Sequence, residues 1–446
     1  MSAAAPDLQI HLDRFDRARL GGFHARLLLL VGLCWLWAAF GVSIIGYVLP
    51  PLKSQWGLSS SQEGLIASTG LVGMMIGAVL AGGLADRIGR RQMLALTMLW
   101  LGVFSGLTAL APGYPALLIL RLLAGLGLGA VLPVASTLVS EYSPARYRGS
   151  LLVLLNGFWG LGSALAALAG YELVTPYGWQ SALLFGALAI ASAPAVRILL
   201  PESMRFWMSK GRLAEALAAA RQIRVTAAES APAPAVPRPA PAAGQPASPF
   251  SPPYRGRTAS LTILWIALNF TFQGVFLWLP SILIAGGNSV SQSYLFSLII
   301  SLGQVPGTLL AAALADRASR RLTFGLCIVF WGIAVFFFGM SRGPAAVLGW
   351  GFLLAVGSGA AWGLAYPFTT ELYPTRMRGF ATGWATGVGR VGGILAPYLV
   401  GVFIQAGIGE GAIFGMLSAA PVLAALSLAS LRQETTGRAL EEISRE

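Results

Sequence analysis

Carboxylates and guanidinium groups occur in two pairs of repeated motifs. The nonapeptide EYSPARYRG at 141–149 returns as ELYPTRMRG at 371–379, and GGLADRIGRR at 82–91 returns as AALADRASRR at 312–321. Surface ion pairs contribute only about 0 to 1 kcal/mol each, but several together bias two conformations that differ by a few kcal/mol. We therefore predict a conformational gate formed by Asp86, Arg90, Glu141, Arg148, Asp316, Arg320, Glu371 and Arg378. Alternatively, the arginines only fix membrane topology and the acids keep the loops soluble.

A second chemical signal is Arg390, which lies in an otherwise charge-free apolar stretch, eleven residues after Gly379. In a helix that begins at Gly379, the guanidinium lies ~16 Å deep, near the middle of a bilayer of roughly 30 Å. An arginine there needs a partner, and no Asp or Glu of the sequence falls at a comparable depth. We expect a ligand carboxylate to supply it, because a carboxylate matches the planar guanidinium. Backbone carbonyls or a helix C-terminus are the structural alternatives.

Polar and aromatic side chains accompany this arginine in neighbouring apolar stretches. Asn269 and Gln273 are four apart and share one face of a helix. Abundant aromatic side chains favour a flat apolar ring over a polyhydroxylated sugar, although most rings in a helical bundle serve packing or interfacial anchoring. The predicted substrate-binding residues are Arg390, Asn269, Gln273, Asn156, Trp37, Phe40, Trp159, Phe276, Trp362 and Tyr366.

Enzymatic chemistry finds little support among the titratable residues. Both histidines, His11 and His24, precede the first apolar stretch, so we expect no metal site, no His-based triad and no cofactor within the membrane. Cys34 and Cys327 each lie in an apolar stretch, which argues against a disulfide framework.

The elements that position these residues are membrane helices. Of the 446 residues, 56% are hydrophobic and 11% are charged, whereas soluble domains are about a quarter charged. The charge-free stretches, divided at turn sequences such as APGYP at 111–115, and the stretch 379–410 with its single arginine together predict twelve spans of about 20 residues or more. Charged residues before the first span argue against a cleaved signal peptide. The sequence predicts an all-α membrane protein.

The net charge of +13 follows membrane topology and does not indicate a nucleic-acid partner. With a cytoplasmic N-terminus, all of the 30 Lys and Arg fall in cytoplasmic segments except Lys53, Arg121, Arg342 and Arg390. The segment SKGRLAEALAAARQIR at 209–224 predicts a short surface helix, and the Pro-rich stretch after it predicts a disordered linker.

The linker separates two homologous halves of six helices. Trp35 and Trp265, Gly73 and Gly303, and the motifs above all keep one offset of 230 residues, as in secondary transporters built from repeats. The predicted organisation is a cytoplasmic tail at 1–26, a first half at 27–200, a cytoplasmic central loop at 201–258, a second half at 259–431 and a cytoplasmic tail at 432–446.

The motifs carry a family resemblance. GGLADRIGRR resembles the loop signature of the major facilitator superfamily, and RLLAGLGLG from Arg121 resembles its fourth-helix motif. PESMRFW at 201 and ETTGRALEEI at 434 resemble the signatures that end the two halves in sugar porters and metabolite symporters. GRVGGILAPY at 389 is similar to the eleventh helix of the branch that imports nicotinate and other aromatic acids. The resemblance implies that Arg121 and Glu141 are candidates for a proton pathway.

The sequence departs from this branch in its first helix. Relatives typically carry two aspartates at positions that fall on Ala38 and Gly41, so the resemblance does not transfer proton symport. Coupling then involves Glu141, a protonated substrate, or no proton. Arg121 either takes part in transport or extends along the helix to the outer surface.

These observations predict a secondary carrier for a small organic anion, an aromatic or heteroaromatic carboxylate. The expected location is a bacterial inner membrane with both termini cytoplasmic, and the expected state is a monomer whose partners are its substrate, lipid and, if coupled, protons. A sugar or polyol porter is the first alternative, an efflux carrier for amphipathic compounds the second, and a transporter-like receptor the third.

Overall fold

The computed structural model describes residues 19–144, 146–222, 248–252, 254–314, 319–373 and 375–431. Within this part of the chain, twelve helices are long and apolar enough to cross a membrane, which confirms the predicted fold class. Because the bilayer core holds no water, every backbone N–H and C=O there must be bonded inside the protein, and helices achieve this. Large side chains such as Val79 and Ile198 are 75% and 77% exposed, as expected for a surface that contacts lipid.

The first half contains six spans between Gly22 and Leu199, of which the fifth and sixth are each made of shorter segments. Its elements are α2 (Gly22–Trp56), α3 (Ser60–Ile88), α4 (Arg90–Ala109), α5 (Tyr114–Glu141), α6 (Arg148–Ala169), η1 (Gly170–Val174), α7 (Thr175–Tyr177), α8 (Trp179–Gly186), η2 (Ala187–Ala191) and α9 (Ser192–Leu199).

The second half contains the other six spans, between Arg255 and Ala429. Its elements are α12 (Arg255–Phe276), α13 (Leu279–Ala285), α14 (Val290–Leu302), α15 (Gln304–Leu314), α16 (Arg320–Met340), α17 (Pro344–Glu371), α18 (Thr375–Gln405) and α19 (Glu410–Ala429). Helices α14 and α15 form one span that is interrupted at Gly303.

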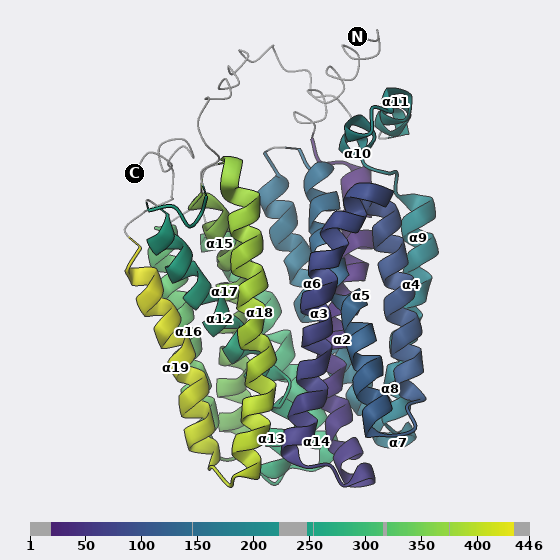
Figure 1. Ribbon diagram of the computed structural model, residues 1–446. Helices are drawn as coiled ribbons and strands as arrows, with labels where there is room; N and C mark the ends of the chain where they lie inside the picture. The colour runs from purple at the N-terminus through teal and green to yellow at the C-terminus, as the bar shows by residue number, and fades with distance from the viewer. Residues whose placement is uncertain are drawn as a thin grey trace.

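Two short helices, α10 (Met204–Ser209) and α11 (Leu213–Gln222), lie outside the bundle at one end (Figure 1). We call this end the α10 face and the other end the opposite face. The position of α11 confirms the predicted surface helix. Most of the Pro-rich linker falls outside the described residues, and only its segment 248–252 is described.

Local structure repeats between the halves with the offset seen in the sequence. Ser59 caps α3 through a capping box with Gln62, and 230 residues later Ser289 caps α14 through the same box with Gln292. Close helix crossings repeat as well. A Cβ added to Gly77 would collide with a backbone carbonyl of α5, and one added to the equivalent Gly307 would collide with a backbone carbonyl of α17. The pseudo-symmetry of the two halves is thereby confirmed.

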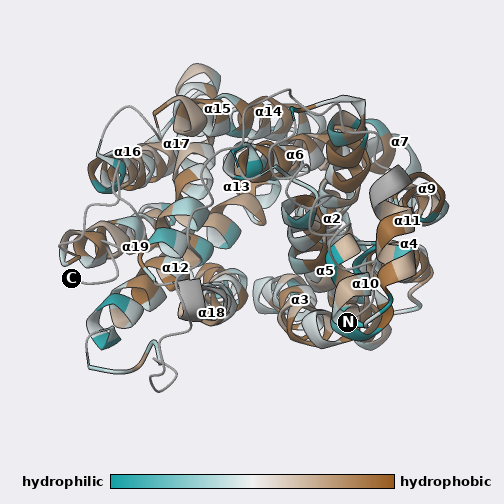
Figure 2. Ribbon diagram, turned by 90° about the horizontal axis from the view of Figure 1, so that it is seen from above, coloured by the Kyte–Doolittle hydropathy of each residue, from teal (hydrophilic) through white to brown (hydrophobic). Residues whose placement is uncertain are grey.

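The halves stand side by side when viewed along the helices, with α3 beside α18 and α6 beside α14 (Figure 2). Among the described residues, the hydrogen bonds that join them lie toward the opposite face. Ser68 Oγ on α3 donates to the carbonyl oxygen of Ile394 on α18 at 2.6 Å, and the Tyr294 hydroxyl on α14 donates to the carbonyl oxygen of Tyr47 on α2 at 2.6 Å. These hydrogen bonds therefore hold the two halves in contact at a distance from the α10 face.

Candidate functional site

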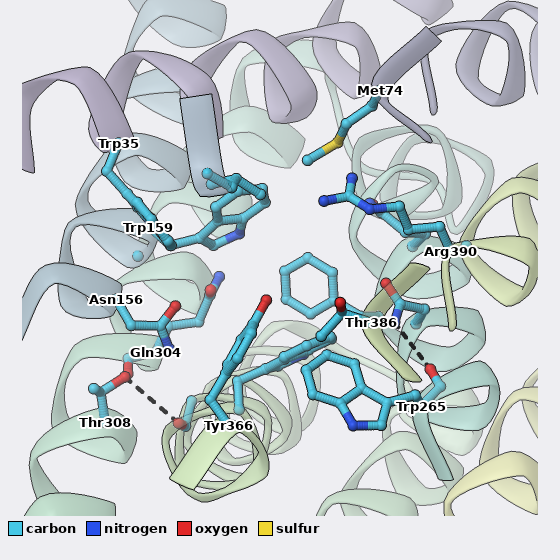
Figure 3. Close-up of a pocket in the computed structure, with 18 of the residues that line it drawn as sticks. Trp35, Met74, Asn156, Trp159, Trp265, Gln304, Thr308, Tyr366, Thr386 and Arg390 are labelled. Carbon is cyan, nitrogen blue, oxygen red and sulfur yellow. Dashed lines mark hydrogen bonds between the residues drawn. The ribbon is translucent and has the colours of Figure 1, made fainter. Parts of the chain in front are cut away.

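A cavity lies between the halves near the middle of the helices. Side chains from α2, α3, α5 and α6 of the first half and α12, α15, α17 and α18 of the second half line it. Its empty volume, including the part that continues into solvent, is ≈ 860 Å³. Figure 3 labels the lining residues Trp35, Met74, Asn156, Trp159, Trp265, Gln304, Thr308, Tyr366, Thr386 and Arg390.

Arg390 on α18 is the only charged residue among the described residues that line the cavity. Its guanidinium points into the cavity, toward Met74 on α3 (Figure 3). Within the described part of the chain it makes no ion pair or hydrogen bond, so backbone carbonyls do not satisfy it. A partly buried guanidinium without a counter-charge favours an anionic ligand, because pairing relieves the cost of its burial.

Aromatic rings form the walls around this charge. Trp265 packs edge-on against Trp362 at 5.5 Å and against Tyr366 at 4.8 Å between ring centroids. Phe272 continues the cluster at 5.9 Å from Trp362. Trp159 of the first half approaches Phe272 at 6.4 Å from across the boundary between the halves. These rings offer flat apolar surface to a planar ligand.

Amide side chains supply most of the remaining polarity. Asn269 Nδ2 donates to the carbonyl oxygen of Trp265 at 2.9 Å, one turn back on α12, and Gln273 follows on the same face. Asn156 and Gln304 lie together on the side of the cavity away from Arg390 (Figure 3). The Nε2 atom of Gln304 is buried and has no hydrogen-bond partner among the described residues.

The lining is pseudo-symmetric in position but not in chemistry. Arg390 on α18 corresponds to Gly160 on α6, and Gln304 on α15 corresponds to Met74 on α3. At one end of the cavity Arg390 points toward Met74, and at the other end the Cβ of Gln304 packs against Gly160. Each end of the cavity therefore has one long polar side chain, and the residue opposite it carries no charged or amide group.

Seven of the ten predicted binding residues line the cavity: Arg390, Asn269, Gln273, Asn156, Trp159, Trp362 and Tyr366. The structure places the other three elsewhere. Trp37 and Phe40 pack against Phe185 in the core of the first half, both at 5.7 Å between ring centroids. Phe276 packs behind Phe272 at 4.7 Å and is not among the lining residues.

Sequence reasoning did not select several lining residues, namely Trp35, Met74, Trp265, Phe272, Gln304 and Thr308. The repeat contained a signal for two of them. Met74 and Gln304 directly follow the paired glycines Gly73 and Gly303, so the same offset identifies them as equivalent positions on helices that cross near the centre.

Five of the predicted gate residues lie at the α10 face, where their ion pairs connect helix ends within each half. Arg90 at the start of α4 contacts Asp86 at 2.7 Å and Glu141 at the end of α5 at 3.4 Å. In the second half, Arg320 at the start of α16 pairs with Glu371 at the end of α17. Among the described residues, these ion pairs join elements of one half and not the two halves to each other.

Of the other three predicted gate residues, the structure describes the side chain of Arg148 only. Arg148 at the start of α6 donates to the carbonyl oxygens of Ser140 and Ser143 at 3.2 and 3.5 Å. Asp316 and the side chain of Arg378 lie outside the described residues.

Glu202, in the PESMRFW motif, was not among the predicted gate residues. Its carboxylate has a structural role at the start of α4. Its buried carboxylate accepts hydrogen bonds from the backbone N–H groups of Arg91 and Gln92, at 3.0 and 3.3 Å, and of Ser203 at 3.0 Å. It thereby satisfies the free amide groups at the start of α4, where a helix dipole favours negative charge. A side chain at Gly89, whose φ is 104°, would collide with this carboxylate.

Arg121 lies inside the first half and does not extend to a surface. It is 4% exposed, and its guanidinium packs against Gly70 and reaches the carbonyl oxygen of Gly41. The alternative of an arginine extended to the outer surface is therefore wrong.

Comparisons with known proteins agree with this architecture. The chain is 38% identical to the niacin transporter NiaP of Acinetobacter baylyi over 97% of this chain and 99% of that protein. It is 30% identical to a gallate transporter of Pseudomonas putida over 93% of each chain. The inward-open structure of the xylose transporter XylE from E. coli superposes with a TM-score of 0.75 at 19% identity, over 94% of this chain and 99% of XylE, which is a likeness of fold.

The family described as sugar (and other) transporter matches residues 26–446, which is nearly the whole chain. Together with the twelve spans and the doubled loop signature, this match establishes a multi-pass membrane transporter and not an enzyme. The chain belongs to the sugar (and other) transporter family of the major facilitator superfamily.

Proposed function

We propose that this transporter moves a small aromatic or heteroaromatic carboxylate across a bacterial inner membrane by alternating access. The observation that carries the proposal is Arg390, an unpaired cation in a central cavity with aromatic walls. A carboxylate forms a charge-assisted, two-point contact with a guanidinium, and a ring attached to it meets Trp159, Trp362 and Phe272.

The relatives support this substrate class. Niacin and gallate, the compounds in the names of the two relatives above, are both carboxylic acids on a single aromatic ring. Neither name establishes the substrate of this chain. Together with Arg390, however, they favour a one-ring acid over larger organic anions.

A sugar or polyol is the second candidate substrate, because four amides line the cavity: Asn156, Asn269, Gln273 and Gln304. Amide groups are suitable partners for hydroxyl groups. A neutral sugar, however, leaves Arg390 without a counter-charge, which is the reason we rank it second.

We further propose that the α10 face is cytoplasmic. Arginines such as Arg90, Arg148 and Arg320 gather at that face, whereas Lys53 and Arg342 lie at the opposite one, as the positive-inside rule requires. Since the halves are fastened together toward the opposite face, the conformation described here is closed to the outside.

The ion pairs at the α10 face support a gating role. In this conformation they hold the ends of α4 and α5, and of α16 and α17, so that each half moves as one body. Closing the cytoplasmic side brings the two sets of charges together, and we propose that they then exchange partners. Any coupled proton would pass by Arg121 and Glu141.

Uptake into proteoliposomes that contain the purified protein tests the transport proposal. Labelled nicotinate or benzoate should accumulate above protein-free vesicles, and an excess of unlabelled aromatic acid should block it. An excess of xylose should not compete. Uptake of labelled xylose that aromatic acids do not inhibit would favour the sugar alternative and contradict the proposal.

A further inference from the structure

The two ends of the cavity differ in the kind of group that they recognise. Arg390 and Thr386 lie one turn apart on α18 and form the cationic end. The pseudo-symmetric positions on α6, Gly160 and Asn156, contribute to the other end, where Gln304 packs against Gly160. We call Gln304 and Asn156 the amide end. In Figure 3 it lies across the cavity from Arg390.

Gln304 has no structural use for its side-chain amide within the described residues. Its backbone carbonyl already accepts the Thr308 hydroxyl at 3.0 Å and packs against Gly359. The side chain is 4% exposed, yet its Nε2 donates to no described residue. A buried amide donor without a partner is costly, so such a group beside a cavity indicates a ligand that accepts its hydrogen bond.

We infer that Gln304, assisted by Asn156, binds a hydrogen-bond acceptor on the substrate ring, so that the transporter selects a pyridine carboxylate over a benzoate of the same shape. This inference rests on the proposed function. With the carboxylate at Arg390 and the ring packed against the aromatic wall to which Trp159 and Phe272 belong, the edge of the ring away from the carboxylate faces the amide end. An unprotonated ring nitrogen accepts there, whereas the C–H of benzoate leaves the amide unpaired.

Binding of nicotinate and benzoate to the purified full-length protein at neutral pH tests this selectivity. Wild type should bind nicotinate about tenfold more tightly, as expected for one hydrogen bond that also satisfies a buried donor. Gln304→Leu keeps a similar volume but removes the amide, so it should weaken nicotinate binding about tenfold and change benzoate binding by less than twofold. Gln304→Glu should weaken nicotinate binding more, because a carboxylate repels the ring nitrogen.

The matched control is Met74→Leu, at the position equivalent to Gln304 in the other half. It changes cavity shape but no hydrogen bond, so the ratio of the two affinities should stay at the wild-type value. Melting temperatures of all variants show that they are folded.

The outcomes separate this inference from the proposed function. If both acids bind through Arg390 with equal affinity, or if Gln304→Leu weakens both equally, the amide end does not select the ring and the inference is wrong. If neither acid binds to folded wild-type protein, the proposed function itself is wrong.

Discussion

The guanidinium of Arg121 reaches the carbonyl oxygen of Gly41 across the interior of the first half, with Nη2 and Nη1 at 3.4 and 3.5 Å from it. These contacts are long, and the Nε of Arg121 has no hydrogen-bond partner among the described residues. Gly41 offers this guanidinium only a neutral backbone carbonyl and no carboxylate. The charge of Arg121 is thus buried, and only long hydrogen bonds to a neutral carbonyl compensate for its burial.

Replacing Arg121 with methionine should therefore not destabilise the protein. A well-packed apolar side chain in place of a poorly paired buried charge is often neutral or stabilising by about 1 to 4 kcal/mol. Transport should nevertheless fall, if Arg121 is needed for the change between conformations. Melting temperature and initial uptake rate are the two measurements. A large loss of stability with normal uptake per folded molecule would show that Arg121 has a structural role.

Glu202 should behave in the opposite way, as a residue needed for stability. Glu202→Ala leaves the backbone N–H groups of Arg91 and Gln92 without their acceptor. Hydrogen bonds to a charged group contribute about 1.5 to 3 kcal/mol each, so we expect a clear drop in melting temperature. Glu202→Gln, which keeps an acceptor oxygen, should recover part of it. Unchanged melting of the alanine variant would contradict this assignment.

Asp86→Asn should alter the balance of conformations more than the stability. Asp86 is 71% exposed, and its ion pair with Arg90 contributes little to folding. The gate proposal predicts a changed distance distribution between spin labels on α3 and α18 at the α10 face, and slower transport. The control is Glu215→Gln, which removes an acid on α11 from its pair with Arg212, away from the bundle. Equal effects of the two variants would contradict the gate.

Closure at the opposite face depends on a backbone contact between α3 and α18. A Cβ added to Gly64 would lie 2.5 Å from the carbonyl oxygen of Pro397. Gly64→Val should oppose closure by about 1 to 3 kcal/mol and shift the population toward the outward-open form by roughly 5- to 150-fold.

Cysteine labelling from the outside measures that shift. Positions near the cavity should become more accessible in Gly64→Val. Gly415→Val on α19 is the control, because no atom lies within 4 Å of its added Cβ. Unchanged outside labelling of Gly64→Val would show that the α3–α18 contact does not control closure.

Much of the fold was predictable because a bilayer imposes simple rules. Charge-free stretches, together with the stretch that contains only Arg390, located all twelve spans, and one offset of 230 residues identified the two halves. Arg390 was found because a charge in a membrane span is rare. Its helix begins at Thr375 and not at Gly379, a difference that leaves it near the middle of the span.

The rotation of each helix about its axis was not predictable. Trp35 lines the cavity, but Trp37 lies two residues later, about 200° around α2, and faces the core of the first half. Lipid, core and cavity all contact apolar side chains, so α2 has no polar face that indicates its orientation. The placement of Gln304 depends on packing against Gly160, which is 144 residues away in the chain.

Binding of matched acid and amide pairs, measured by calorimetry on wild type, Arg390→Ala and Arg390→Lys, tests the central claim most directly. Wild type should bind the acid and reject its amide, which lacks the negative charge. Arg390→Lys keeps the charge but loses the planar two-point contact, so it should bind the acid more weakly, and Arg390→Ala should fold but lose acid binding. If folded Arg390→Ala binds the acid as tightly as wild type, the arginine is not the site of carboxylate recognition and the account is contradicted.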